Sequence, residues 1–225
     1  LFDDPAVMAA RRAELGLDRP VAVQYVDWMG RALRLDFGRS LLYTRPVNDL
    51  LGERALNTAV LAFAALLLAT GVGIPLGIYT AARAGGWGAR LVRALSLVLL
   101  SMPPLVASLA LVLLAARTGW LPVGGMSSPE SADLGWAAWL ADLARHVPLP
   151  ALALALPFAA TLERLQSQAL GDALAQPFVR AAEARGLSRD QAVIGHAWRV
   201  SLAPVLGLYG LMIGTLFSGS FIVEV

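Results

Sequence analysis

The chain contains four long apolar stretches separated by more polar segments. Residues 56–82 and 91–116 each exceed the roughly 20 residues that a helix needs to cross about 30 Å of hydrocarbon. A shorter apolar stretch covers residues 147–162, and a fourth runs over residues 201–225. This pattern predicts an all-α, polytopic membrane helix bundle with four visible spans.

Prolines interrupt two of these stretches. Met102, Pro103 and Pro104 lie in the middle of the second stretch. Proline lacks a backbone donor and clashes with the preceding turn, so the helix is predicted to kink or break there. The sequence leaves open whether this break belongs to a gate or is a tolerated kink. Pro148, Pro150 and Pro157 are in the third stretch.

Glycines punctuate the first and fourth stretches. Gly71, Gly73 and Gly77 lie inside the first, and Gly210 and Gly214 form a small-xxx-small pair in the fourth. Residues without a side chain let helix backbones approach closely. We therefore predict close helix packing at these positions.

Residues 1–55 are mixed in character and form an extramembrane segment, followed by the membrane domain over residues 56–225. Within the segment, residues 21–35 carry apolar positions, including Tyr25 and Trp28, at roughly helical spacing. Two interpretations stay open. One is an amphipathic helix on the membrane surface, and the other is a helix packed on its own neighbours.

The composition supports a membrane protein and excludes several other classes. Hydrophobic residues make up 57% of the chain and charged residues 15%, too few to cover a soluble body of 225 residues. The net charge of +2 comes from dispersed basic and acidic residues, which argues against nucleic acid as a partner. There is no cysteine, phosphate-binding loop, nucleophile–base pair or metal-ligand cluster. His146 and His196 alone make no metal site. We expect a non-enzyme without cofactor or metal.

Arginine placement predicts the orientation of the spans. The segments 83–93 and 163–200 are rich in Arg, which favours the cytoplasmic side. Segment 117–146 has fewer Arg residues and contains Trp120, Trp136 and Trp139, which suit a membrane interface on the outer side. Residues 1–55 then lie outside as well.

The loop over residues 166–200 carries local folding signals. The sequence from Pro177 to Arg185 is compatible with a helix that stops at Gly186. Ser188 stands three residues before Gln191, the spacing of a capping box, so a second helix is predicted to begin there. The loop is thus predicted to form a compact helix–turn–helix that projects into the cytoplasm.

The same loop resembles the cytoplasmic EAA loop of ABC-transporter permeases. The run RAAEARGLS over 180–188, followed by His196, Arg199, Leu202 and Pro204, is similar to the dipeptide/oligopeptide permease branch. Arg180 occupies the position of a Glu in the general motif, and the peptide branch shows the same departure. Further resemblance lies in residues 15–20, 36–40, 45–47, 73–77 and 119–122, so it extends over nearly the whole chain.

The resemblance implies a six-span inner-membrane subunit of a bacterial or archaeal importer, lacking its first and last spans here. Such a subunit pairs with a similar or identical permease, receives its solute from an extracytoplasmic binding protein, and docks its coupling loop on a cytoplasmic ABC ATPase. ATP-driven closure then switches the pathway between the two faces. The expected solutes are di- or oligopeptides, with nickel chelates or glutathione as alternatives. The coupling residues it implies are Arg180, Ala181, Ala182, Glu183, Arg185, Gly186, Leu187, Ser188, His196 and Arg199.

Two other classes remain as rivals. An ion-coupled secondary transporter usually keeps ionisable residues inside its spans, whereas the first three predicted spans have none in their interiors and the fourth has only Glu224. A membrane anchor of a signalling assembly is the other. Glu163 and Arg164, adjacent at a span end, are expected to meet headgroups or water, and His196 is expected to make a structural hydrogen bond within the loop.

Overall fold

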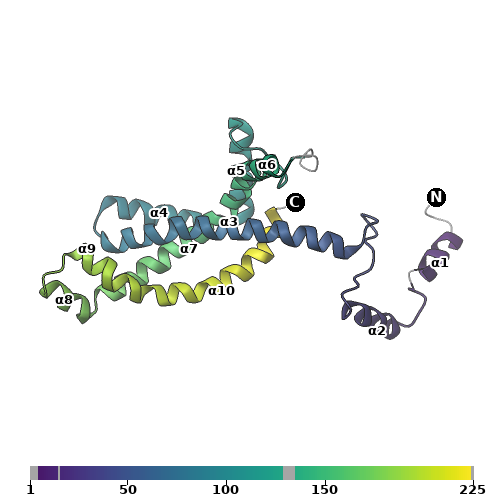
Figure 1. The fold of residues 1–225 in the computed structure, drawn as a ribbon, viewed down its shortest axis with the longest axis horizontal. Helices are drawn as coiled ribbons and strands as arrows, with labels where there is room; N and C mark the ends of the chain where they lie inside the picture. The colour runs from purple at the N-terminus through teal and green to yellow at the C-terminus, as the bar shows by residue number, and fades with distance from the viewer. Residues whose placement is uncertain (1–4, 15, 129–134, 224–225) are drawn as a thin grey trace. The chain divides into compact units, whose positions relative to one another are not determined.

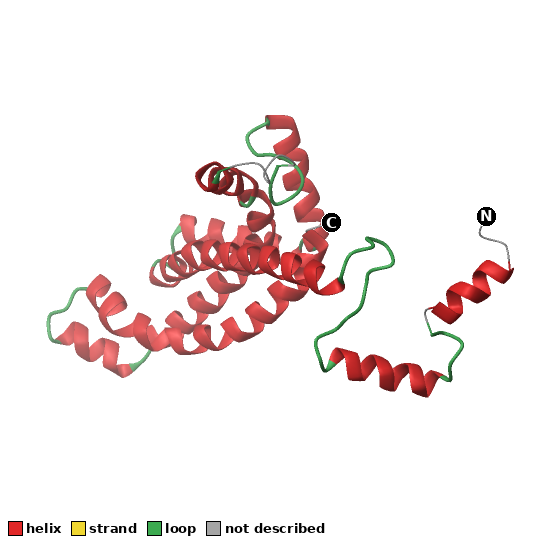
Figure 2. Ribbon diagram, turned by 45° about the vertical axis from the view of Figure 1, so that its right-hand side comes forward, coloured by secondary structure: helices red, strands yellow, loops and turns green. Residues whose placement is uncertain are grey.

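The computed structural model describes residues 5–14, 16–128 and 135–223, in two compact units, Leu1–Leu56 and Asn57–Val225. All regular elements in these residues are helices (Figures 1 and 2), which confirms the predicted all-α class. Apart from the predicted helix–turn–helix, the elements are α1 (Pro5–Glu14), α2 (Val21–Ala32), α3 (Val47–Ala82), α4 (Trp87–Ser101), α5 (Pro104–Thr118), α6 (Trp136–His146), α7 (Pro148–Leu174) and α10 (Trp198–Val223).

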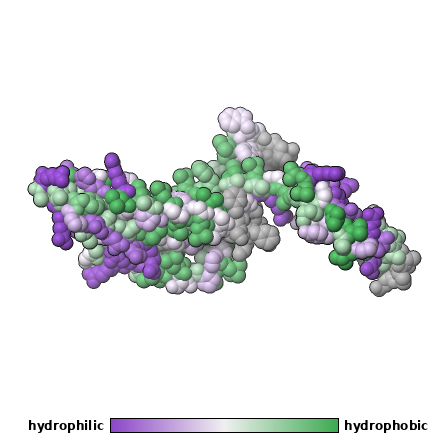
Figure 3. All heavy atoms as spheres, turned by 90° about the horizontal axis from the view of Figure 1, so that it is seen from below, coloured by the Kyte–Doolittle hydropathy of each residue, from purple (hydrophilic) through white to green (hydrophobic). Residues whose placement is uncertain are grey.

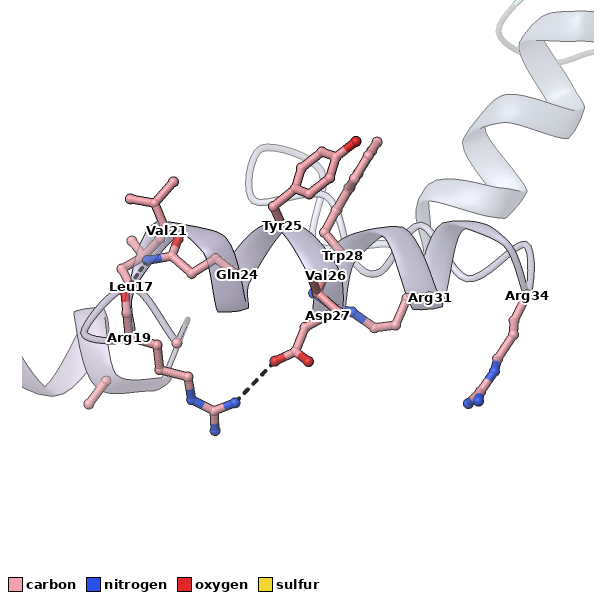
Figure 4. A pocket seen from close by; sticks show the side chains of 13 residues that line it. Leu17, Arg19, Val21, Gln24, Tyr25, Val26, Asp27, Trp28, Arg31 and Arg34 are labelled. Carbon is pink, nitrogen blue, oxygen red and sulfur yellow. Dashed lines mark hydrogen bonds and ion pairs between the residues drawn. The ribbon is translucent and has the colours of Figure 1, made fainter.

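Helix α2, in the first unit, is amphipathic. Its Tyr25 and Trp28 side chains project to one side of the helix, whereas Asp27 points to the other and pairs with Arg19 at 3.2 Å (Figure 4). None of the residues of α2 is buried. The exposed Tyr25 and Trp28 are available to a membrane surface or to neighbouring helices, so both interpretations of this helix stay predictions.

Two helices are long and apolar enough to cross a membrane unaided. They are α3, with 36 residues, and the continuous helix Arg189–Leu216, which includes the described side chains of α10. In Figure 3, apolar residues cover the middle of the helix bundle and polar residues gather at its end. This distribution is expected of a bundle whose sides face lipid and whose end faces water.

The second apolar stretch breaks where the prolines predicted. Helix α4 ends at Ser101, α5 begins at Pro104, and the two helices differ in direction by 107°. Met102 is extended, with φ −83° and ψ 127°, because a residue before proline is disfavoured in the α region. The pair α6 and α7 is bent by 43°. The described residues thus provide two membrane spans, or up to four if each bent pair counts as one.

Helix α7 is the centre of the bundle. It packs against α4, α5 and α10 and also contacts α6. Its inner positions are largely alanine, which lets neighbouring helices approach closely. The main apolar core brings together Leu61 of α3, Leu162 of α7 and Met212 of α10, each at most 2% exposed.

Helices α3 and α7 touch at two glycines. A Cβ added at Gly73 would lie 2.6 Å from the carbonyl oxygen of Ala159, and one at Gly77 would lie 2.7 Å from that of Glu163. This confirms the predicted close packing for both residues. A Cβ at Gly71, Gly210 or Gly214 would meet no described atom within 4 Å, so the prediction is not met at those positions within this chain.

Candidate functional site

The predicted helix–turn–helix is present as a knob formed by residues 177–197. Its first helix, α8 (Pro177–Ala184), starts with proline at its first position and ends before Gly186. Gly186 has φ +94°, and its N–H donates to the carbonyl of Glu183 at 2.9 Å. The predicted helix stop at Gly186 is confirmed, because this left-handed conformation strongly favours glycine.

The second half of the knob begins with the predicted capping box. The Gln191 N–H donates to Ser188 Oγ at 3.4 Å, and the Ser188 N–H donates to Gln191 Oε1 at 2.9 Å. Helix α9 (Arg189–Ala192) follows, then a π-helical turn, η2 (Val193–Ala197), and then α10. The knob is therefore continuous with the last helix of the chain.

The helices extend further into the predicted loop than the hydropathy pattern indicated. Helix α7 runs to Leu174, although the loop was expected from residue 166, and α10 begins at Trp198 rather than Ser201. Polar residues at the end of an apolar stretch mark the expected limit of the hydrocarbon. They do not end a helix, since Glu, Gln and Arg are good helix formers.

A second apolar cluster fixes the knob to the bundle. Val179 of α8 is buried together with Val193 of η2, Leu170 of α7 and Ala81 of α3. Burial of these side chains anchors the knob to the ends of two long helices.

The residues implied by the resemblance divide into one buried side chain and a mostly exposed group. Ala182 is 7% exposed and serves packing. Leu187 is half-buried, and the remaining members are exposed: Arg180, Ala181, Glu183, Arg185, Gly186, Ser188, His196 and Arg199. Within the described part of the chain no charged side chain of this group makes an ion pair. Their charges are thus free to meet a partner.

An exposed apolar patch adjoins these charges. Ile194 on η2 is 60% exposed and lines a shallow hollow of about 500 Å³ with Leu187, Asp190, Gln191 and Gly195. The sequence pattern did not point to Ile194. Its exposure depends on which side of the continuous helix packs against α8, and hydropathy alone does not specify that side.

The surroundings of His196 and Glu163 differ from those expected from the sequence. The interpretation of His196 as a structural hydrogen-bonder is wrong, because its imidazole is exposed and has no hydrogen bond to any described residue. The expectation that Glu163 meets headgroups or bulk water at the end of the span is also wrong. Its side chain is 1% exposed, since it lies on the face of α7 that packs against Gly77 of α3. Arg164 is exposed. Glu224 lies outside the described residues.

The break between α4 and α5 is accessible from outside the chain. Met102 is half-buried, and Pro103 and Pro104 are exposed. The N–H groups of Val106 and Ala107 both reach the carbonyl of Pro103, so α5 starts immediately after the break. The two helices are joined by a short extended corner.

The long apolar helices and the capped knob between two of them define a polytopic membrane protein with a helical loop at one end of its bundle. Residues 73–225 match the family described as binding-protein-dependent transport system inner membrane component. The chain belongs to this family of non-catalytic permease subunits of ABC importers, which act in the inner membrane.

Curated relatives resemble the chain over nearly its whole length. A putative peptide permease protein of Brucella ovis is 36% identical over 97% of this chain and 68% of its own length. The oligopeptide transport system permease protein OppB of Mycobacterium bovis is 35% identical over 97% of this chain and 69% of its own length. A putative peptide transport system permease protein of Brucella abortus is 32% identical over 98% of this chain and 68% of its own length. The family assignment replaces the secondary-transporter and signalling-anchor alternatives.

Proposed function

We propose that this chain forms part of the pathway through which di- or oligopeptides, delivered by an extracytoplasmic binding protein, cross the inner membrane. The relatives named as peptide permeases, at 32–36% identity over nearly the whole chain, carry the proposal. A second permease subunit, similar or identical, completes the pathway. Nickel chelates and glutathione are the alternative solutes, which competition against peptide uptake distinguishes.

The knob is the proposed docking element for the ATPase. It presents Arg180, Glu183 and Arg185, which make no ion pair with any described residue, and its η2 turn presents the exposed Ile194. An apolar contact surrounded by charges is a common composition for a specific interface. Because α9 continues into α10 and α8 follows α7 closely, closure of two ATPases would shift both helices.

The direct test measures uptake of a radiolabelled tripeptide by vesicles that contain the complete transporter with its ATPase and binding protein. We expect uptake that requires ATP and the binding protein and is reduced by other short peptides. Uptake of a nickel chelate or glutathione that peptides do not reduce would reject the proposed solute class.

The proposed orientation predicts which side each loop faces. Because the chain has no cysteine, single substitutions can be labelled selectively. Gly85→Cys and Ala184→Cys are expected to react with a membrane-impermeant maleimide only from the cytoplasmic side, and Ser128→Cys only from the outer side. A Cβ at Gly85 meets no described atom within 4 Å, so that substitution is not expected to disturb the fold. Labelling of Ala184→Cys and Ser128→Cys from the same side would contradict the orientation.

The corner between α4 and α5 is proposed to form part of a gate. Replacing Pro103 and Pro104 together by alanine removes a constraint of about 3 kcal/mol against a continuous helix. We expect tripeptide uptake to fall about tenfold in vesicles with unchanged amounts of complex. Pro204→Ala, at a position where α10 continues through the proline, is the control. Unchanged uptake by the normally assembled double variant would instead make the corner a tolerated kink.

A further inference from the structure

A buried polar layer crosses the bundle between its apolar core and the knob. It consists of Thr80 of α3, Glu163 and Gln166 of α7, and Ser201 of α10, all at most 2% exposed. Along α7, the layer lies between Leu162 of the main core and Leu170 of the knob's cluster. Along α10, Ser201 likewise lies between Ala197 of the knob's cluster and Val205 of the main core.

Hydrogen bonds in this layer link four helices. Thr80 Oγ1 donates to Glu163 Oε1 at 2.6 Å, which joins α3 to α7. Gln166 Nε2 donates to Ser201 Oγ at 2.8 Å, which joins α7 to α10, and Ser201 Oγ donates to the carbonyl of Trp198. Arg93 of α4 donates to the carbonyl of Thr80 at 2.6 Å.

Two buried oxygens of the layer have no donor among the described residues. They are Glu163 Oε2 and Gln166 Oε1. Because the two residues are three positions apart on α7, their side chains lie on the same face of the helix. An unsatisfied buried acceptor is unfavourable, and a single water molecule can donate to two such oxygens. The chemistry of the pair therefore fits an internal water.

The contacts around the polar layer are apolar packing contacts and not hydrogen bonds. Gly73 and Gly77 of α3 pack on the backbone of α7, and half of the buried positions of α7 are alanine. Such apolar contacts are non-directional and permit one helix to slide along another. Hydrogen bonds require a fixed direction and distance, so the polar layer specifies the register of α3 against α7.

We propose that Thr80, Glu163, Gln166 and Ser201 form a hydrated joint that makes α3 follow the movement of the knob. The proposal rests on the proposed coupling function. Helices α7 and α10 connect to the knob through the chain, whereas α3 reaches it only through side-chain contacts. Glu163 is the positioning residue of this joint, because its carboxylate receives the hydrogen bond from α3.

The principal test is Thr80→Val in the complete transporter, with tripeptide uptake and ATP hydrolysis measured in the same vesicles. Valine keeps the shape of threonine and removes the hydroxyl group. We expect the amount of peptide moved per ATP to fall about tenfold, the upper end of the effect of losing one hydrogen bond. Both rates are measured per assembled complex, and we expect the rate of ATP hydrolysis per complex to stay unchanged. Thr80→Ser, which keeps the hydroxyl, is expected to retain the wild-type ratio within about twofold.

Either of two results would overturn the joint. One is an unchanged ratio of peptide to ATP in Thr80→Val, and the other is a fall in uptake that only follows a loss of assembled complex. If the wild-type transporter moves a solute other than peptides, the proposed solute class is rejected but the joint is not. The amount of solute moved per ATP can then be compared between wild type and Thr80→Val with that solute.

The hydration of the joint has its own test. In Glu163→Gln, the new amide can donate to Gln166 Oε1 directly and replace the water, so we expect the wild-type ratio of peptide to ATP. Glu163→Leu, which cannot accept from Thr80, is expected to show the same loss as Thr80→Val. A structure of the wild-type complex that resolves ordered water should show one within hydrogen-bond distance of both oxygens. Absence of that water there would overturn the hydrated joint.

Discussion

Gly186→Val is expected to reduce tripeptide uptake about tenfold or more, because a β-branched residue at positive φ costs about 1–3 kcal/mol. Gly186 has φ +94° and connects the two halves of the knob. No described atom lies within 4 Å of a Cβ at this position, so the strain comes from the backbone and not from a clash. The knob should therefore change its direction or loosen.

The membrane helices should insert normally in this variant. The turn lies outside the long apolar helices, and the clusters around α7 contain no contact from Gly186. We expect wild-type amounts of the subunit in the membrane but little ATPase retained when the complex is purified. Purification of the complex together with uptake in the same membranes measures both effects.

Two control variants separate the turn from general damage to the knob. Gly186→Asn is expected to be milder than Gly186→Val, since asparagine tolerates a left-handed conformation better. Gly171→Ala changes an exposed glycine of α7, just before the knob, that has no positive φ and where an added Cβ would meet no described atom within 4 Å, and it should leave uptake unchanged. A Gly186→Val complex that keeps its ATPase and transports at the wild-type rate would refute the docking role of the knob.

The features that sequence reasoning predicted correctly depend on local chemistry. The break near Pro103, the helix stop at Gly186 and the capping box of Ser188 each follow from the properties of a few adjacent residues. These signals act within one turn of backbone. Packing against other helices changed none of them.

The features that sequence reasoning missed depend on which helices pack against each other. Glu163 follows the last residue of an apolar stretch and has the polarity of a membrane boundary, yet α7 continues through it and turns it toward α3. Gln166 is buried for the same reason. The sequence also predicted a break near Pro103 but not its angle of 107°, because the packing of α4 and α5 on α7 sets the direction of each helix. Hydropathy records the polarity of a residue and not the identity of its neighbour.

The contact between α3 and α7 should be sensitive to any added side chain. In Gly73→Val the new Cβ would lie 2.6 Å from the carbonyl oxygen of Ala159 and 2.8 Å from Cβ of Leu162. Neither atom is the flexible end of a side chain, so the two helices must separate. Overpacking of this kind costs about 1–3 kcal/mol or more. Separation would also lengthen the bond between Thr80 and Glu163, two turns further along α3.

We therefore expect Gly73→Val to lower the amount of assembled transporter about fivefold or more, in line with that destabilisation. Gly71→Val is the matched control, since a Cβ two residues away on the same helix would meet no described atom within 4 Å. It carries the same β-branched side chain and the same cost in helix propensity. The measurement is the yield of complex in mild detergent together with its thermal stability. Equal yields and equal stabilities for the two variants would contradict the close packing of α3 on α7, whereas a selective loss in Gly73→Val would support it.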